Sequence, residues 1–165
     1  MSPIPKPAKR APRPARRIAR KVRVRKVKKA SRGKLGREAD RLFSLIVRSR
    51  GFCEARGVRT LHAGPLQCAH IIGRSYRSTR WDEENAFCLC AGCHRFWTSR
   101  PIEFRRFVVD MRGIVWFDEV TSRALHPWDK DIVGVVARLR ERAVELGLEV
   151  EAADLLKRER EKANG

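Results

Sequence analysis

The sequence has no apolar run approaching the ~20 residues that a helix needs to cross a bilayer, and it is poor in acids. It contains 19 Asp and Glu residues against 38 Lys and Arg residues, a formal net charge of +19 at pH 7. The missing apolar run predicts a soluble protein without a membrane segment. The shortage of acids predicts a polyanionic partner, because excess positive charge attracts such a partner and releases its counterions. Charge alone does not distinguish DNA, RNA and an acidic membrane surface.

Acids are absent altogether from the first 33 residues, which contain fourteen Lys or Arg residues and several prolines. A segment of this composition cannot bury enough apolar surface to fold alone. We therefore expect residues 1–33 to form a disordered basic arm. The arm has no apolar core of about 7–15 residues behind its charges, so it is not expected to be a secretory signal.

The cysteines are few and odd in number, at positions 53, 68, 88, 90 and 93. An odd set in one short region argues against a disulfide framework and favours metal binding. Cys90 and Cys93 have the spacing with which two thiolates grip one tetrahedral Zn²⁺. A structural zinc needs two more ligands, for which we expect Cys53 and Cys68, with His62 as the second choice for the latter. The remaining cysteine, at position 88, is expected to be a small core residue.

Hydrophobic spacing predicts two short strands flanked by helices, which is an α+β fold. The strands are expected at 66–72 and 86–89, separated by an arginine-rich loop. A leading amphipathic helix is expected to run from Glu38 to Arg48 and to end before Gly51. Further helices are expected after Cys93, from Pro101 to Gly113, at 118–125, at 130–146 and in the tail from 149.

Three motifs fall in one short window that runs from the first predicted strand to the start of the next helix. Ala69-His70-Ile71-Ile72 ends the first apolar run, Asn85 opens the second, and Cys90-Ala-Gly-Cys93-His94 closes the window. Their order resembles the HNH (ββα-metal) endonuclease family. The segments Leu-Gln-Cys-Ala-His-Ile and Arg-Trp-Asp-x-x-Asn-Ala resemble phage-type members, and recombination nucleases of the NinG type are more distantly similar. The resemblance covers roughly residues 50–110.

The resemblance implies a zinc-stapled, treble-clef-like ββα core within residues 34–112, which include the leading helix, followed by a C-terminal helical extension at 113–165. It implies an endonuclease that hydrolyses DNA phosphodiester bonds, with His70 as the general base, Asn85 as an orienting residue and His94 as a ligand of a catalytic divalent metal such as Mg²⁺ or Mn²⁺. It also implies phage or prophage DNA processing or recombination in the cytoplasm of a bacterial host, associated with the nucleoid. The partners would be duplex or branched DNA and, in that setting, other phage DNA-processing proteins.

The chemistry of hydrolysis is consistent with these roles. A neutral imidazole accepts a proton from water near neutral pH, and a divalent cation neutralises charge at the phosphate. One position departs from the family pattern, because Ala69 stands where many members have an acidic metal ligand. The catalytic metal would then either need a further protein ligand or rely on water and substrate phosphate. The candidates for that further ligand are Asp82, Glu83, Glu84 and Glu103.

Arginines gather in the loop between the strands and at the following helix. Their guanidinium groups form forked hydrogen bonds to phosphate oxygens, so we expect DNA contacts from Arg74, Arg77, Arg80, Arg95 and Arg100. Phosphate contacts position a duplex without reading its sequence. We therefore expect cleavage with little sequence specificity. The alternatives are a non-catalytic zinc-knuckle DNA-binding protein and a basic RNA-binding protein.

Overall fold

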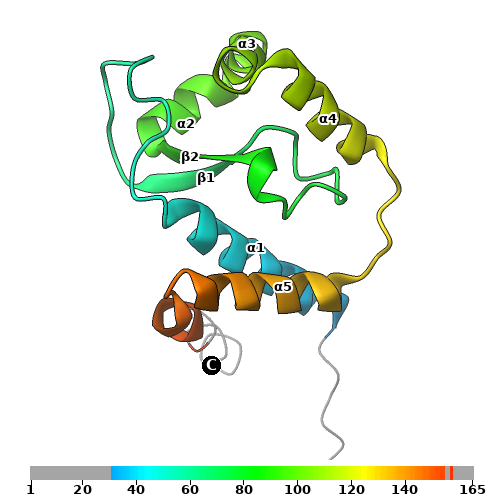
Figure 1. The fold of residues 1–165 in the computed structure, drawn as a ribbon. Helices are drawn as coiled ribbons and strands as arrows, with labels where there is room; N and C mark the ends of the chain where they lie inside the picture. The colour runs from blue at the N-terminus through cyan, green and yellow to red at the C-terminus, as the bar shows by residue number, and fades with distance from the viewer. Residues whose placement is uncertain (1–30, 155–156, 158–165) are drawn as a thin grey trace, which may run out of the picture.

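The computed structural model describes residues 31–154 and residue 157, so the predicted arm lies almost wholly outside the described residues. One α-helix precedes the two strands and four follow them, and residues 149–154 form a further helical segment (Figure 1). In chain order they are α1 (Arg32–Arg48), β1 (Leu66–His70), a 3-10 turn (Glu83–Asn85), β2 (Ala86–Cys90), α2 (Ala91–Thr98), α3 (Pro101–Arg112), α4 (Ile114–Leu125) and α5 (Ile132–Glu145). The α+β prediction is confirmed.

Helix α1 begins six residues earlier than its apolar spacing predicts. Ser31 caps it, because the Ser31 hydroxyl oxygen accepts a hydrogen bond from the backbone N–H of Lys34 at 3.4 Å. The buried stripe of α1 includes Leu42, Phe43 and Ile46 and packs in one core cluster with α5 (Figure 1). This pair of helices forms one of the layers that cover the hairpin.

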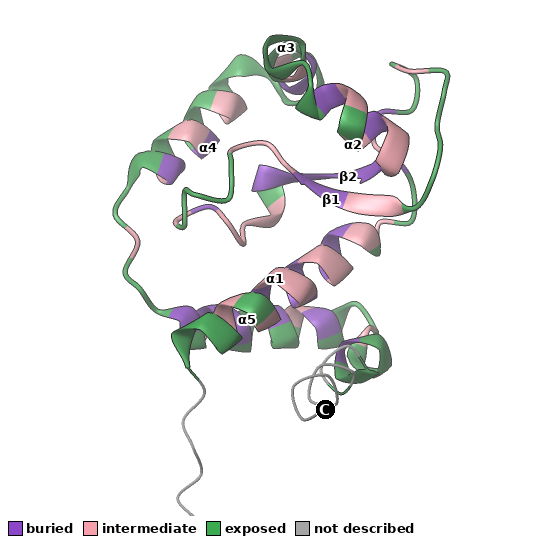
Figure 2. Ribbon diagram, turned by 180° about the vertical axis from the view of Figure 1, so that it is seen from behind, coloured by how far each residue is buried: buried purple, intermediate pink, exposed green. Residues whose placement is uncertain are grey.

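Strands β1 and β2 form an antiparallel hairpin whose two faces are both covered (Figure 2). Cys68 pairs with Cys88, and both side chains belong to the core cluster on the α1 and α5 side. Ala69 pairs with Phe87, and both belong to the second cluster, beneath α2 and α3. Successive residues of a strand point to opposite faces, so the hairpin lies between two helical layers.

Three element boundaries differ from the sequence prediction for local reasons. β1 ends at His70, because the backbone N–H of Ile72 donates to the Asn85 side chain at 2.7 Å. α2 begins at Ala91, since the Cys90 sulfur caps it by accepting from the backbone N–H of Cys93 at 3.5 Å. α4 begins directly after Gly113, whose φ of 89° allows the chain to turn there. No helix in the described part of the chain is long and apolar enough to span a membrane.

Candidate active site and metal centre

Three cysteines and one histidine converge beside the start of α2. The ligand atoms of Cys53, His62, Cys90 and Cys93 all lie within 4.8 Å of one another. The His62 Nδ1 atom is 3.4 Å from the Cys93 sulfur and 3.8 Å from the Cys90 sulfur. Zn–S bonds of about 2.3 Å and Zn–N bonds of about 2.1 Å in a tetrahedron place ligand atoms at about these separations. The group is therefore suited to zinc.

The hydrogen bond of His62 Nε2 determines the tautomer of the ring, and so whether Nδ1 presents a lone pair to the thiols. His62 Nε2 lies 2.9 Å from the carbonyl oxygen of Arg59, which can only accept a hydrogen bond. Nε2 therefore carries the proton, and Nδ1 is free to bind a cation, as in many metal sites where the distal nitrogen is hydrogen-bonded.

The prediction that Cys68 completes the zinc set is corrected by the structure, which places His62 there instead. Cys68 lies on the opposite face of the hairpin, in the core cluster of α1 and α5. Burial raises the pKa of its thiol to about 12, and Cys68 is not among the four residues whose ligand atoms converge. Cys88 is fully buried, as expected for a core residue.

The thiols of the cluster differ in acidity. Burial would raise the pKa of Cys90, but hydrogen bonds, the first of them from the backbone N–H of Cys93, outweigh it and lower the pKa to about 6. Burial and hydrogen bonds with its neighbouring thiols raise the pKa of Cys93 to about 12. The pKa of Cys90 is thus lowered and that of Cys93 raised, and binding a cation would release the remaining thiol protons.

His70 stands at the end of β1, half-buried against α1. Its ring lies 5.4 Å from the Phe43 ring, centroid to centroid. Its Nε2 donates to the backbone carbonyl of Arg80 at 2.9 Å, which leaves Nδ1 as a proton acceptor. Burial lowers the pKa of His70 below its usual 6.5; the charge of Arg74 also lowers it, while the Arg80 carbonyl and Asp40 oppose this. The ring is therefore neutral at physiological pH, as a general base requires.

Asn85 ties the end of β1 to the loop that follows it. Its side-chain oxygen accepts from the backbone N–H of Ile72 at 2.7 Å. Its side-chain nitrogen donates to the carbonyl oxygens of Ile72 at 3.1 Å and Thr79 at 3.0 Å. Asn85 is completely buried, so these bonds satisfy polar atoms that water cannot reach. The side chain fixes the loop on which the His70 acceptor lies.

Asp40 of α1 holds the same loop from the other side, although no motif in the sequence marks it. Its two carboxylate oxygens accept from the Arg80 guanidinium at 2.9 and 2.7 Å. One of them also accepts from the Trp81 indole N–H at 2.9 Å. Because the Arg80 carbonyl orients His70, Asp40 acts on His70 through the loop. Nothing in the spacing of α1 distinguishes this acid from an ordinary surface acid.

His94 lies in the first turn of α2, above the other face of the hairpin. Its Nδ1 donates to the side-chain oxygen of Gln67 at 2.7 Å, so its Nε2 carries the free lone pair. Gln67 precedes Ala69 by two residues and so shares its face of β1. Burial lowers the pKa of His94, and Arg74 lowers it further. Arg74 has the same effect on His70, so one exposed guanidinium influences both rings.

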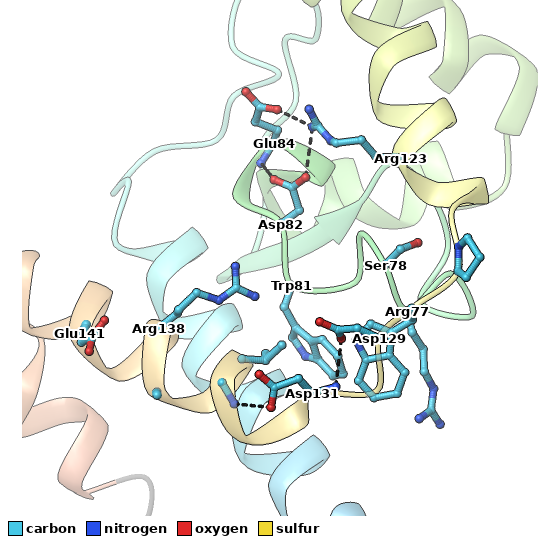
Figure 3. A pocket seen from close by; sticks show the side chains of 15 residues that line it. Arg77, Ser78, Trp81, Asp82, Glu84, Arg123, Asp129, Asp131, Arg138 and Glu141 are labelled. Atoms are coloured by element: carbon cyan, nitrogen blue, oxygen red, sulfur yellow. Dashed lines mark hydrogen bonds and ion pairs between the residues drawn. The ribbon is translucent and has the colours of Figure 1, made fainter.

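Three of the four acids considered as substitutes for a ligand at position 69 are engaged in ion pairs. Asp82 and Glu84 both pair with Arg123 of α4 (Figure 3), and Glu83 pairs with Arg142 of α5. Glu103 is exposed on α3. Within the described residues, the Cys₃His cluster is the only group of three or more His, Cys, Asp or Glu donors. His94 therefore offers one ligand atom, and the described side chains do not complete a second metal site around it.

The five predicted DNA-binding arginines fall into three groups. Arg74 and Arg95 are exposed, and Arg95 lines a hollow beside His94. Arg77 lies over the ring of Trp128 and Arg100 over the ring of Phe96, at 5.1 and 4.2 Å from the centroids. Arg80 is different, because its guanidinium is bound by Asp40. Arg80 therefore holds the loop, and its contact with phosphate stays a prediction.

A hairpin that leads directly into a helix, with a histidine ending the first strand, a buried asparagine opening the second and a thiol cluster at the helix start, defines a ββα nuclease core. Residues 52–105 match the model of the HNH endonuclease family. The chain thus carries an HNH endonuclease domain, whose members are phosphodiester hydrolases that act on DNA and generally use a divalent metal. Comparisons with curated proteins and with solved structures gave no match.

Proposed function

We propose that this protein is a metal-dependent DNA endonuclease of low sequence specificity, with His70 as its general base. The observation that carries the proposal is the hydrogen bond from His70 Nε2 to the Arg80 carbonyl. It fixes the tautomer that has a lone pair on Nδ1. The lowered pKa of His70 keeps that lone pair free at neutral pH.

In the proposed reaction, His70 Nδ1 accepts the proton of a water molecule that attacks the phosphodiester phosphorus. Asn85 and Asp40 hold the loop that orients the ring, so no reorganisation is needed when the proton moves. Arg74, near both histidines, would attract the phosphate. A divalent cation held by His94 Nε2, water and substrate phosphate would supply charge neutralisation at the leaving oxygen.

A structural zinc would be held, apart from the catalytic residues, by Cys53, His62, Cys90 and Cys93. The zinc would fasten the loop of residues 53–62 to the start of α2, which carries His94. The remaining parts of the proposal rest on the sequence. The arm of residues 1–33 would add sequence-independent affinity for DNA, and a role in phage or prophage DNA processing rests on the resemblance of the strand motifs alone.

The decisive experiment is a plasmid-nicking assay titrated with Mg²⁺ and Mn²⁺, comparing the wild type with His70→Ala. General base catalysis contributes about 10²–10⁴-fold, so we expect a loss of that size with DNA binding and zinc content unchanged. His126→Ala is a matched control, because His126 is exposed after α4. Equal nicking by wild type and His70→Ala would overturn the assignment of His70. A single strongly preferred cleavage site would overturn the low specificity.

A further inference from the structure

A groove of about 590 Å³ lies on the α1 side of the molecule, next to the loop that orients His70. We call it the tryptophan groove, because Trp81 and Trp128 both line it, from the loop before β2 and the segment before α5. The centroids of these two rings are 6.0 Å apart, with 55° between their planes. The groove brings together α1, the interstrand loop and the start of α5.

The charges around the tryptophan groove are almost all positive. The acid on its lining, Asp40, is already paired with Arg80. The other charged residues that line it are Arg32, Arg37, Arg77 and Lys130. All four are exposed, so the groove presents an excess of cations to solvent. Such a lining attracts a polyanion.

A second hollow, drawn in Figure 3, adjoins the tryptophan groove and has the opposite balance of charges. It shares Arg77, Trp81 and Trp128 with the tryptophan groove. Its acids outnumber its cations, and they are Asp82, Glu84, Asp129, Asp131 and Glu141. An incoming phosphate chain would be repelled there, so the difference in charge directs a polyanion into the basic groove.

Aromatic rings combined with flanking cations are the features that bind unpaired nucleotides, since every base has a flat face that stacks on an aromatic ring. The Arg77 guanidinium lies 5.1 Å from the centre of the Trp128 ring. A flat cation therefore already covers one ring. A base in a duplex is stacked on its neighbours, so only an unpaired base can make this contact.

The groove is connected to the catalytic histidine through a single residue. The Arg80 backbone carbonyl holds His70, while the Arg80 side chain lines the groove. Trp81, the next residue, forms part of the groove wall. A strand bound in the groove would thus run beside the loop that orients the general base.

We propose that the tryptophan groove binds an unpaired, single-stranded segment of the DNA substrate, next to the bond that is cut. This inference rests on the proposed nuclease function and adds a substrate class to it. The enzyme would then prefer DNA in which a duplex meets a single strand, such as a flap or a branch, over fully paired DNA.

The test measures binding of labelled oligothymidylate and of a blunt duplex by the full-length protein at about 0.15 M salt, using anisotropy and tryptophan fluorescence quenching. Trp128→Leu removes the ring but keeps an apolar side chain, and Trp128→Phe keeps an aromatic face. Loss of one stacked base costs about tenfold in affinity. We expect Trp128→Leu to bind the single strand about tenfold more weakly, with Trp128→Phe and the duplex affinity almost unchanged.

A second pair of variants tests the groove without touching its packing. Arg37→Glu reverses an exposed charge on the groove lining. Arg106→Glu reverses an exposed charge on α3, which does not line the groove. We expect the first to weaken oligothymidylate binding and to reduce its salt dependence, with a slope change of at least about 0.7. The second is expected to leave the ratio of single-strand to duplex affinity unchanged.

The outcomes separate this inference from the proposed function. If Trp128→Leu and Arg37→Glu both bind oligothymidylate with wild-type affinity, the groove does not bind the single strand. Equal losses of affinity for duplex and single strand would also overturn the proposal. Tighter binding of oligouridylate than of oligothymidylate would overturn the choice of DNA. Plasmid nicking that depends on His70 would still support the nuclease in each of these cases. Equal cleavage rates on flap and blunt duplex substrates would overturn the substrate preference.

Discussion

The two faces of the β1–β2 hairpin are built in different ways. On the face toward α1, His70 is held entirely by the protein, through the Arg80 carbonyl, the Asn85 side chain and the Asp40 carboxylate. On the face toward α2, the cysteine cluster gathers four ligand atoms within 4.8 Å of one another, and His94 keeps a lone pair on Nε2, so both can bind a cation. One face is complete without metal, and the other is arranged for it.

This difference suggests that orientation of the base and binding of cations are separable properties. The base is fixed by hydrogen bonds that need no metal, so changes on the α1 face should alter the chemical step at constant metal affinity. Changes on the α2 face should alter metal content or metal requirement and leave the pH dependence of the base in place. The following predictions, from the largest effect to the smallest, test this separation.

The largest effect is expected from loss of the Cys₃His cluster. His62→Ala should lose the bound zinc and lower Tm by about 10 °C, because metal binding contributes directly to folding and a cost of about 3 kcal/mol shifts Tm by that order. Cys68→Ala is the control, since Cys68 lies outside the cluster. Zinc content and thermal unfolding are the measurements. Retention of zinc by His62→Ala together with its loss in Cys68→Ala would restore the original ligand set.

The next effect is expected from Asp40→Asn, which weakens the grip on Arg80. Misplacing a catalytic group by about 1 Å costs about 10²-fold, so we expect kcat to fall by about 10–100-fold with little change in KM. The Asp40 charge raises the pKa of His70, so its removal should shift the acid limb of the pH–rate profile to lower pH. Glu38→Gln removes an α1 acid that pairs with Arg140 instead, and should change neither quantity.

A smaller effect is expected from Gln67→Leu, which removes the acceptor for His94 Nδ1. Partners of this kind typically contribute about 10–100-fold to metal affinity. We expect the metal concentration for half-maximal cleavage to rise by that order, at unchanged maximal rate. Gln67→Glu keeps an acceptor and should restore the wild-type requirement. Nitrogen-15 NMR of the His94 ring provides a readout independent of activity. In Gln67→Leu the ring should no longer be held in the Nδ1–H tautomer and should show a mixture of both tautomers.

The smallest effect is expected from Arg74→Gln. The Arg74 charge lowers the pKa of both His70 and His94, so both values should rise when it is removed. Because the base acts in its neutral form, the acid limb of the pH–rate profile should move to higher pH. The slope of log K for duplex binding against log salt concentration should become about 0.9 less steep, because one phosphate contact is lost. An acid limb that stays in place would contradict the proposed influence of Arg74 on His70.

Much of the fold followed from local patterns. Gly113 and Pro101 marked helix boundaries, and the short apolar runs at 66–72 and 86–89 marked the strands. The motif with His70, Asn85 and Cys90-x-x-Cys93-His94 led to the family that the comparison supports. These signals are readable because each lies within a few residues of the structure that it produces.

The sequence by itself determined the element types, the positive charge and the order of the reactive residues. Only the tertiary structure decided that His62 and not Cys68 joins the thiols, that Asp40 binds Arg80, and that Trp81 meets Trp128. These contacts join residues distant in the chain, and the face on which a side chain lies depends on strand register and helix packing. Spacing along the chain specifies neither the strand register nor the helix packing, because both are set only when the layers assemble.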